Sequence, residues 1–143
     1  MGANDNPLER FIDIFRRLDK DSLQLLDELY APNAIFEDPL HRIEGLPALR
    51  EYFGKLYNGV ISIEFAVGER AQQGERGALS WIMTMRHKKL KGGAPIAVHG
   101  ASFLRFNSAG LIVSHRDYFD LGEMLYENIP LLGAAIRLVR RKV

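Results

Sequence analysis

The stretch ISIEFAVG, residues 61–68, decides the fold class, because the spacing of apolar residues changes there. Ile61, Ile63, Phe65 and Val67 alternate with small or polar residues, which predicts a strand with one buried face. Before this stretch, apolar residues recur at helical spacing, and after it the period of two continues. Helices followed by a run of strands are typical of an α+β fold.

Three helices are expected upstream. The first follows Pro7, a residue suited to a first helical turn, and the second carries an apolar stripe over residues 25–30. Pro32 is expected to end the second helix. The third starts near Pro47 and is expected to stop at the Asn-Gly pair 58–59.

A short strand and a four-strand meander complete the expected order. The short strand covers residues 34–37, and the meander covers residues 61–68, 78–88, 96–106 and 111–119. The predicted architecture is a cone-shaped, curved antiparallel sheet with three N-terminal helices packed on its concave face. With 143 residues, the chain is expected to form one domain over residues 1–143.

Composition narrows the function classes. A net charge of +1 gives no broad basic footprint, so no nucleic-acid partner is expected. The sequence has no cysteine, which excludes disulfides, thiol nucleophiles and cysteine metal sites and fits a reducing compartment. We see no signal-peptide pattern and no apolar run of roughly 18 residues, so a cytoplasmic protein is expected.

The tail LLGAAIRLVRRKV, residues 131–143, predicts one more short helix. Its cations are favoured near a helix C-terminus in any case. A role at a membrane surface is the less favoured interpretation because the apolar face is short. We therefore expect no membrane partner.

The acidic pair in IFEDP, residues 35–39, raises the question of a site. The pair Glu37-Asp38 follows two apolar residues, and Asp38 precedes a proline, where an aspartate commonly bonds to its own turn backbone. The alternative is a carboxylate at the wall of the apolar space between helices and sheet, where it would be suited to acid–base chemistry.

The segment SHRDYFD, residues 114–120, is polar on both faces of a predicted strand. His115, Asp117 and Phe119 share one face, so an imidazole and a carboxylate can bond to each other or address one ligand. The alternative is a solvated face with surface ion pairs of little energetic value. Because the strand must bury one face, its buried polar groups need partners, which favours a site.

Two further patterns concern the wall of the site and metal. Trp81, Met83 and Met85 share a face and are either plain core or an apolar ligand wall that adapts to ligand shape. His115 and Asp117 have the His-x-Asp spacing of a facial triad, but no second motif accompanies them. We expect no metal and no cofactor. No phosphate-binding glycine loop or GxSxG motif is present.

LYAPNAIFEDPLHRIEGLPALREYF and FLRFNSAGLIVSHRDYFDL together resemble the nuclear transport factor 2-like superfamily, which includes ketosteroid isomerase, SnoaL-like polyketide cyclases and limonene-1,2-epoxide hydrolase. The resemblance implies that Asp38 matches the isomerase's general base. It also implies that Asp117 matches an acid–base aspartate of the cyclases and hydrolases. The isomerase's oxyanion donors fall at Ile14 and Ser102, and neither is an equivalent donor.

The predicted function is a small-molecule enzyme of isomerase, cyclase or epoxide-hydrolase type, using carboxylates for proton transfer or water activation on an apolar substrate. The predicted catalytic residues are Asp38, Asp117 and His115. The predicted substrate-binding residues are Trp81, Met83, Met85, Ser102 and Phe119. The alternative is a non-catalytic binding or dimerisation protein of the same fold.

A homodimer is expected. Ile82, Phe103 and Tyr118 fall by alternation on the outer face of the sheet and are together too apolar for water. The resemblance implies pairing through that face, and a two-fold interface must be self-complementary.

Overall fold

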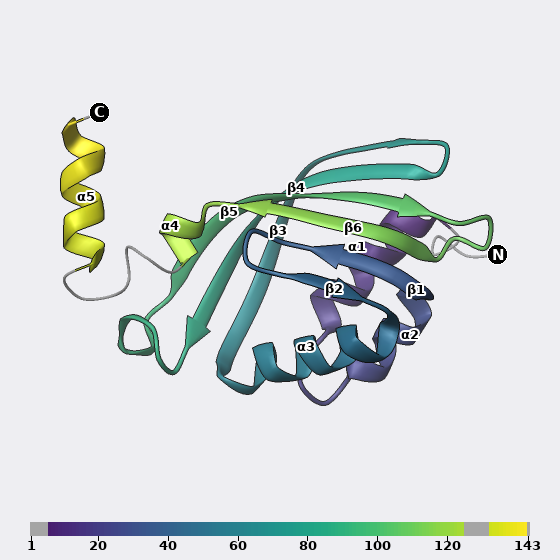
Figure 1. The fold of residues 1–143 in the computed structure, drawn as a ribbon, viewed down its shortest axis with the longest axis horizontal. Helices are drawn as coiled ribbons and strands as arrows, with labels where there is room; N and C mark the ends of the chain where they lie inside the picture. The colour runs from purple at the N-terminus through teal and green to yellow at the C-terminus, as the bar shows by residue number, and fades with distance from the viewer. Residues whose placement is uncertain (1–5, 125–131, 143) are drawn as a thin grey trace.

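A curved sheet arches over helices from the first part of the chain (Figure 1). The computed structural model describes residues 6–124 and 132–142. The helices are α1 Pro7–Arg17, α2 Leu26–Leu29, α3 Leu46–Asn58, α4 Leu121–Met124 and α5 Leu132–Lys142, with 3-10 turns η2 Leu23–Leu25 and η3 Lys91–Gly93. The strands are β1 Tyr30–Glu37, β2 Arg42–Glu44, β3 Val60–Gln73, β4 Arg76–His87, β5 Ile96–Phe106 and β6 Ile112–Phe119.

The strand order is β2-β1-β6-β5-β4-β3, and every neighbouring pair is antiparallel except β1 and β6. The predicted α+β cone with helices on one face is confirmed. The parallel β1–β6 pairing and the short β2 were not predicted. The strands β1 and β6 are far apart in the sequence, so no local pattern reveals their pairing. The strand β2 has only three residues, which is too short to give a periodic signal.

The expected end of the second helix is wrong. The α2 helix ends at Leu29, and the chain enters β1 at Tyr30, so Pro32 lies within a strand. A proline is tolerated there because β2 pairs only with Ile35–Glu37 and leaves the edge of β1 near Pro32 uncovered. The spacing of the leucines could not distinguish one turn of helix from two.

The core lies between the helices and the concave face of the sheet. Asn6 caps α1 by accepting from the backbone N–H groups of Leu8 and Glu9, and α1 then buries Phe11 and Ile14. Gly100 allows the Trp81 ring to lie against the backbone of β5, since a Cβ there would fall 2.2 Å from the ring. Trp81 is thereby fixed on the concave side.

In the described part of the chain, no helix has both the length and the apolar character needed to cross a bilayer.

Candidate functional site

A cavity of about 410 Å³ lies between the helices and the concave face of the sheet. Apolar side chains from α1, α3 and four strands form most of its wall. The structure brings together at this cavity all eight residues singled out from the sequence: Asp38, Trp81, Met83, Met85, Ser102, His115, Asp117 and Phe119. Their position is thus established, while their roles remain predictions.

The parallel pairing of β1 and β6 brings the two aspartates to the same level of the sheet, because Asp117 lies in β6 and Asp38 directly follows the last residue of β1. Phe36 pairs with His115, and their rings contact each other edge to face inside the cavity. The next pair, Glu37 and Arg116, forms an ion pair, and neither residue lines the cavity. One residue further, Asp38 just past the end of β1 and Asp117 within β6 again line the cavity, as continued alternation requires.

A buried histidine holds the carboxylate of Asp117. The Nε2 atom of His115 lies 2.6 Å from Oδ1 of Asp117, and its Nδ1 atom lies 2.7 Å from the hydroxyl of Tyr30. His115 is 2% exposed and Tyr30 is 1% exposed. Burial, and after it the charge of Asp117, raises the pKa of Tyr30 well above its usual value, so this hydroxyl keeps its proton.

The hydrogen-bond partners assign the histidine tautomer. Among the described residues, the hydroxyl of Tyr30 has no other acceptor, so it donates to Nδ1 of His115. The imidazole is then neutral and donates from Nε2 to Asp117. Both ring nitrogens of His115 are thus engaged by described residues, and its predicted catalytic role stays a prediction.

Ser102 completes the support of Asp117. Its hydroxyl donates to Oδ1 of Asp117 at 2.5 Å and accepts from the indole N–H of Trp81 at 2.9 Å. Both bonds to Asp117 therefore use Oδ1. Oδ2 accepts no hydrogen bond from the described residues, and the side chain is 19% exposed at the cavity.

Asp38 combines the turn bonds of one interpretation with the cavity position of the other, and its acid–base role stays a prediction. Its Oδ1 accepts from the backbone N–H groups of Leu40 and His41, as in a turn, and lies 3.2 Å from Nδ1 of His41. Its Oδ2 accepts from the hydroxyl of Tyr52 at 2.7 Å. Asp38 thus lines the cavity with both oxygens engaged.

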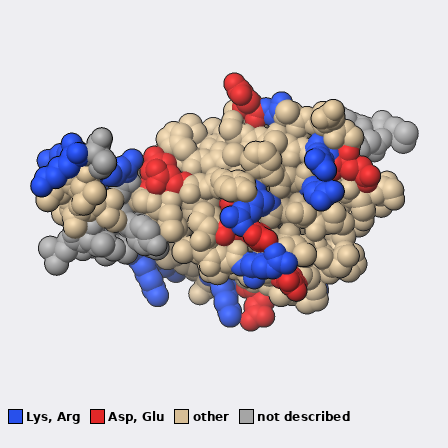
Figure 2. All heavy atoms as spheres, turned by 45° about the horizontal axis from the view of Figure 1, so that its top comes forward, with Lys and Arg blue, Asp and Glu red and all other residues tan. Residues whose placement is uncertain are grey.

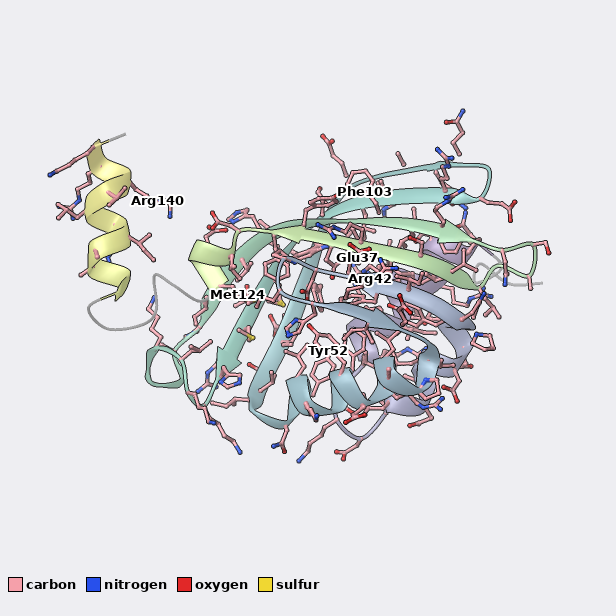
Figure 3. All side chains as sticks on the ribbon, in the orientation of Figure 1. Glu37, Arg42, Tyr52, Phe103, Met124 and Arg140 are labelled. Atoms are coloured by element: carbon pink, nitrogen blue, oxygen red, sulfur yellow. The ribbon has the colours of Figure 1, made fainter. Side chains whose placement is uncertain are left out.

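Tyr30 and Tyr52 are the site residues that the sequence did not reveal. Tyr52 reaches from α3 into the space beneath the sheet (Figure 3), and burial, then its bond to Asp38, raises its pKa. Tyr30 was interpreted only as part of the apolar stripe at residues 25–30, and Tyr52 only as a residue of the expected third helix. No local pattern could show that their hydroxyls meet His115 and Asp38, because those contacts depend on tertiary packing.

No metal site is apparent in the described ranges, where no three His, Asp or Glu side chains are grouped closely enough to hold an ion. His99 does not line the cavity; its side chain is exposed, and its Nδ1 atom lies 3.2 Å from a carboxylate oxygen of Glu123.

A family model identifies the family of the chain, and solved structures show its fold. The profile of the SnoaL-like domain matches residues 8–115. A nuclear transport factor 2-like protein of unknown function from Burkholderia pseudomallei is 18% identical, with a TM-score of 0.73 over 87% of this chain and 96% of that chain. A search of curated proteins found no match.

Two further solved structures show the same fold. One is from Shewanella denitrificans, and its assignment as a SnoaL-like polyketide cyclase is itself a proposal. It is 16% identical, with a TM-score of 0.72 over 87% of this chain and 95% of that one. The other, from Catenulispora acidiphila, has a ketosteroid isomerase-like fold and is in complex with trimethylamine. It is 18% identical, with a TM-score of 0.66 over 74% and 81% of the two chains.

Proposed function

The chain belongs to the SnoaL-like domain family, and we propose that it is an enzyme that moves protons on an apolar small molecule held in the cavity. One observation carries the proposal. Oδ1 of Asp117 is fixed by His115 and Ser102, while Oδ2 is left without a bond from the described residues at the cavity wall. A carboxylate held in this way is prepared for acid–base work.

Asp117 is the proposed catalytic base. Its Oδ2 takes a proton either from a carbon next to a substrate carbonyl or from a water molecule, and the carboxyl can return the proton in a later step. Positioned proton transfer of this kind contributes about 10²- to 10⁴-fold to a rate. An isomerase, a cyclase and an epoxide hydrolase all include such a step, which is why these three reaction types stay together in the proposal.

Asp38 and Tyr52 form the second polar group of the cavity. Because the pKa of Tyr52 is raised, its hydroxyl stays protonated at neutral pH and remains a donor. It donates to Asp38 and can turn instead towards a substrate oxygen that gains charge. We propose that this pair orients the substrate and that Asp117 exchanges the proton.

The substrate class follows from the wall. Trp81, Met83, Met85 and Phe119 present apolar surface to the cavity, and methionine side chains adapt to ligand shape. A volume of about 410 Å³ falls within the roughly 300–1,000 Å³ of small-molecule sites. The trimethylamine complex of the relative from Catenulispora acidiphila supports a small ligand for this fold.

The test begins with mass spectrometry of small molecules extracted from the purified protein. The molecule found, and a set of cyclic ketones, are then incubated with the protein in D₂O, and carbon-bound deuterium is followed by NMR. Asp117→Asn is expected to lower the exchange rate by about 10²- to 10⁴-fold. Asp13→Asn, a matched change at a half-exposed carboxylate on α1, is expected to leave it unchanged.

Full exchange in Asp117→Asn would refute the assignment of the base. A ligand that binds in the cavity without exchange or conversion would favour the alternative, a binding protein of the same fold.

We also propose a homodimer formed through the outer face of the sheet, in the cytoplasm. Ile82, Phe103 and Tyr118 are exposed there, and the rings of Phe103 and Tyr118 contact each other edge to face. Phe103 points away from the cavity side of the sheet (Figure 3). Light scattering over a dilution series tests the dimer, and a monomer at tens of micromolar would contradict it. The absence of cysteine supports the compartment.

A further inference from the structure

The C-terminal helix α5 exposes apolar and basic side chains side by side. Leu138 and Val139 are 53% and 61% exposed. Residues 132–142 contain no acidic residue and four cations, Arg137, Arg140, Arg141 and Lys142. A short helix with an apolar face and a basic face is typical of segments that lie in the interface of a membrane.

The loop between β4 and β5 also combines basic side chains with an apolar one. It carries Lys88, Lys89 and Lys91, and no Asp or Glu occurs anywhere from residue 76 to residue 116. Lys89 and Leu90 also line the cavity, so this loop is part of its rim. Two further lining residues of the rim, Leu40 and Leu56, are exposed apolar side chains.

Charge is therefore segregated along the chain. We name the seven cations of the β4–β5 loop and α5 the basic end: Lys88, Lys89, Lys91, Arg137, Arg140, Arg141 and Lys142. With these seven set aside, twelve cations and eighteen acids remain, a net charge of −6. Figure 2 shows blue side chains gathered on α5, whereas red and blue are interspersed over the sheet.

The two parts of the basic end lie near the same end of the molecule. Figure 1 places α4 and the β4–β5 loop at the end from which α5 extends, far from the start of α1. Met124, the last residue of α4, lines the cavity, and eight residue steps separate it from Leu132. At about 3.6 Å per step, α5 begins within roughly 29 Å of the cavity wall.

We propose that the basic end docks on the surface of a bilayer that contains anionic lipids, with the apolar rim of the cavity turned towards the lipid. The cations supply attraction to lipid phosphates, and Leu138 and Val139 supply the apolar contact that a soluble polyanion such as RNA does not need. This inference replaces the expectation of no membrane partner, because the structure leaves the apolar residues of α5 exposed.

The docking itself stands whether or not Asp117 catalyses a reaction. Its consequence for the substrate rests on the proposed function: the ligand would be an apolar molecule that partitions into the bilayer and enters the cavity across Leu40, Leu56 and Leu90.

Flotation with vesicles tests the proposal. The full chain is mixed with vesicles of phosphatidylcholine alone or of phosphatidylcholine and phosphatidylglycerol at three to one, in 0.1 M salt. Binding is expected only with the anionic vesicles, and each neutralised cation is expected to lower the partition constant about fivefold. Lys88→Gln with Lys91→Gln should therefore lower it roughly 25-fold.

Two variants separate this proposal from general electrostatic attraction. Arg76→Gln with Arg105→Gln removes the same charge from exposed positions on the sheet, and binding is expected to stay within about twofold. Leu138→Ser with Val139→Ser keeps every charge and is expected to lower binding at least fivefold, with an unchanged thermal unfolding curve because both residues are exposed.

Three results with vesicles would overturn the proposal. They are no binding to anionic vesicles, equal losses in the two double charge variants, and full binding by Leu138→Ser with Val139→Ser. The last result would point to a soluble polyanion. Self-association that is lost in Leu138→Ser with Val139→Ser, seen by light scattering without vesicles, would point instead to a second copy of the chain.

Discussion

Tyr30→Phe removes one hydroxyl from the support of the proposed base. In the structure that hydroxyl lies 2.7 Å from Nδ1 of His115, and both side chains are almost fully buried. The change leaves Nδ1 as a buried acceptor without a donor, which costs about 1–3 kcal/mol of unfolding free energy. The ring of phenylalanine keeps the apolar packing, so the loss reports on the hydrogen bond rather than on a cavity.

Urea unfolding followed by circular dichroism measures that loss, and nitrogen-15 NMR of labelled histidine reports the tautomer. In the unmodified protein we expect the proton of His115 on Nε2, the atom that faces Asp117. Ser108→Ala is the control, because it removes a hydroxyl from an exposed turn position, and should change stability by less than about 0.5 kcal/mol. Equal stability of the two variants, or a proton on Nδ1 in the unmodified protein, would refute the assigned hydrogen-bond order.

Three other predictions concern pH, packing and metal. Burial raises the pKa of Tyr30, Tyr52 and Tyr57 above the usual value near 10. The stability that these protonated side chains contribute is therefore complete below pH 10 and is lost as the pH rises through their raised pKa values. An ultraviolet titration in which all the tyrosines ionise near pH 10 before the protein unfolds would contradict this. Gly100→Ala should destabilise the protein by about 1–3 kcal/mol, because the new Cβ would overlap the Trp81 ring. Gly54→Ala in α3 meets only an ordinary contact with Leu23 and should stabilise the protein by about 0.4–1 kcal/mol. Urea unfolding measures both changes. Untagged protein should contain no stoichiometric zinc or iron by elemental mass spectrometry, and a bound equivalent would restore the facial-triad interpretation of His115 and Asp117.

Local patterns predicted most of the fold. Pro7 at the start of α1 and the Asn-Gly pair at the end of α3 are local signals, and both helices appeared where expected. The alternation at residues 61–68 located a strand correctly but too short, because β3 continues to Gln73. The leucine stripe at residues 25–30 was misleading because one helical turn and the start of a strand can both bury such side chains. The third strand of the meander, residues 96–106, was predicted with both ends correct.

The site could be predicted only in part. Alternation placed His115, Asp117 and Phe119 on one face, and they do line the cavity together. The hydroxyls of Tyr30 and Tyr52 could not be assigned, since their partners lie on other elements. Nor could the sequence show that one oxygen of Asp117 accepts no bond from the described residues while both oxygens of Asp38 do, because that difference depends on Ser102 and Tyr52.

The parallel pairing of β1 with β6 determines when the cavity can form during synthesis. Tyr30 and His115 are 85 residues apart, so the part of the cavity wall formed by β1 and β6 cannot assemble until the ribosome has released nearly the whole meander. Until then, β1 has only the three-residue β2 beside it, and the apolar faces of α1 and α3 lack their cover. Contacts of such long range slow folding and leave nascent chains open to aggregation. A chain truncated early in β6 would therefore lose the proposed base together with the strand that completes its core. Such a chain would be unfolded, and chaperones and proteases would bind or degrade it, rather than folded and merely inactive.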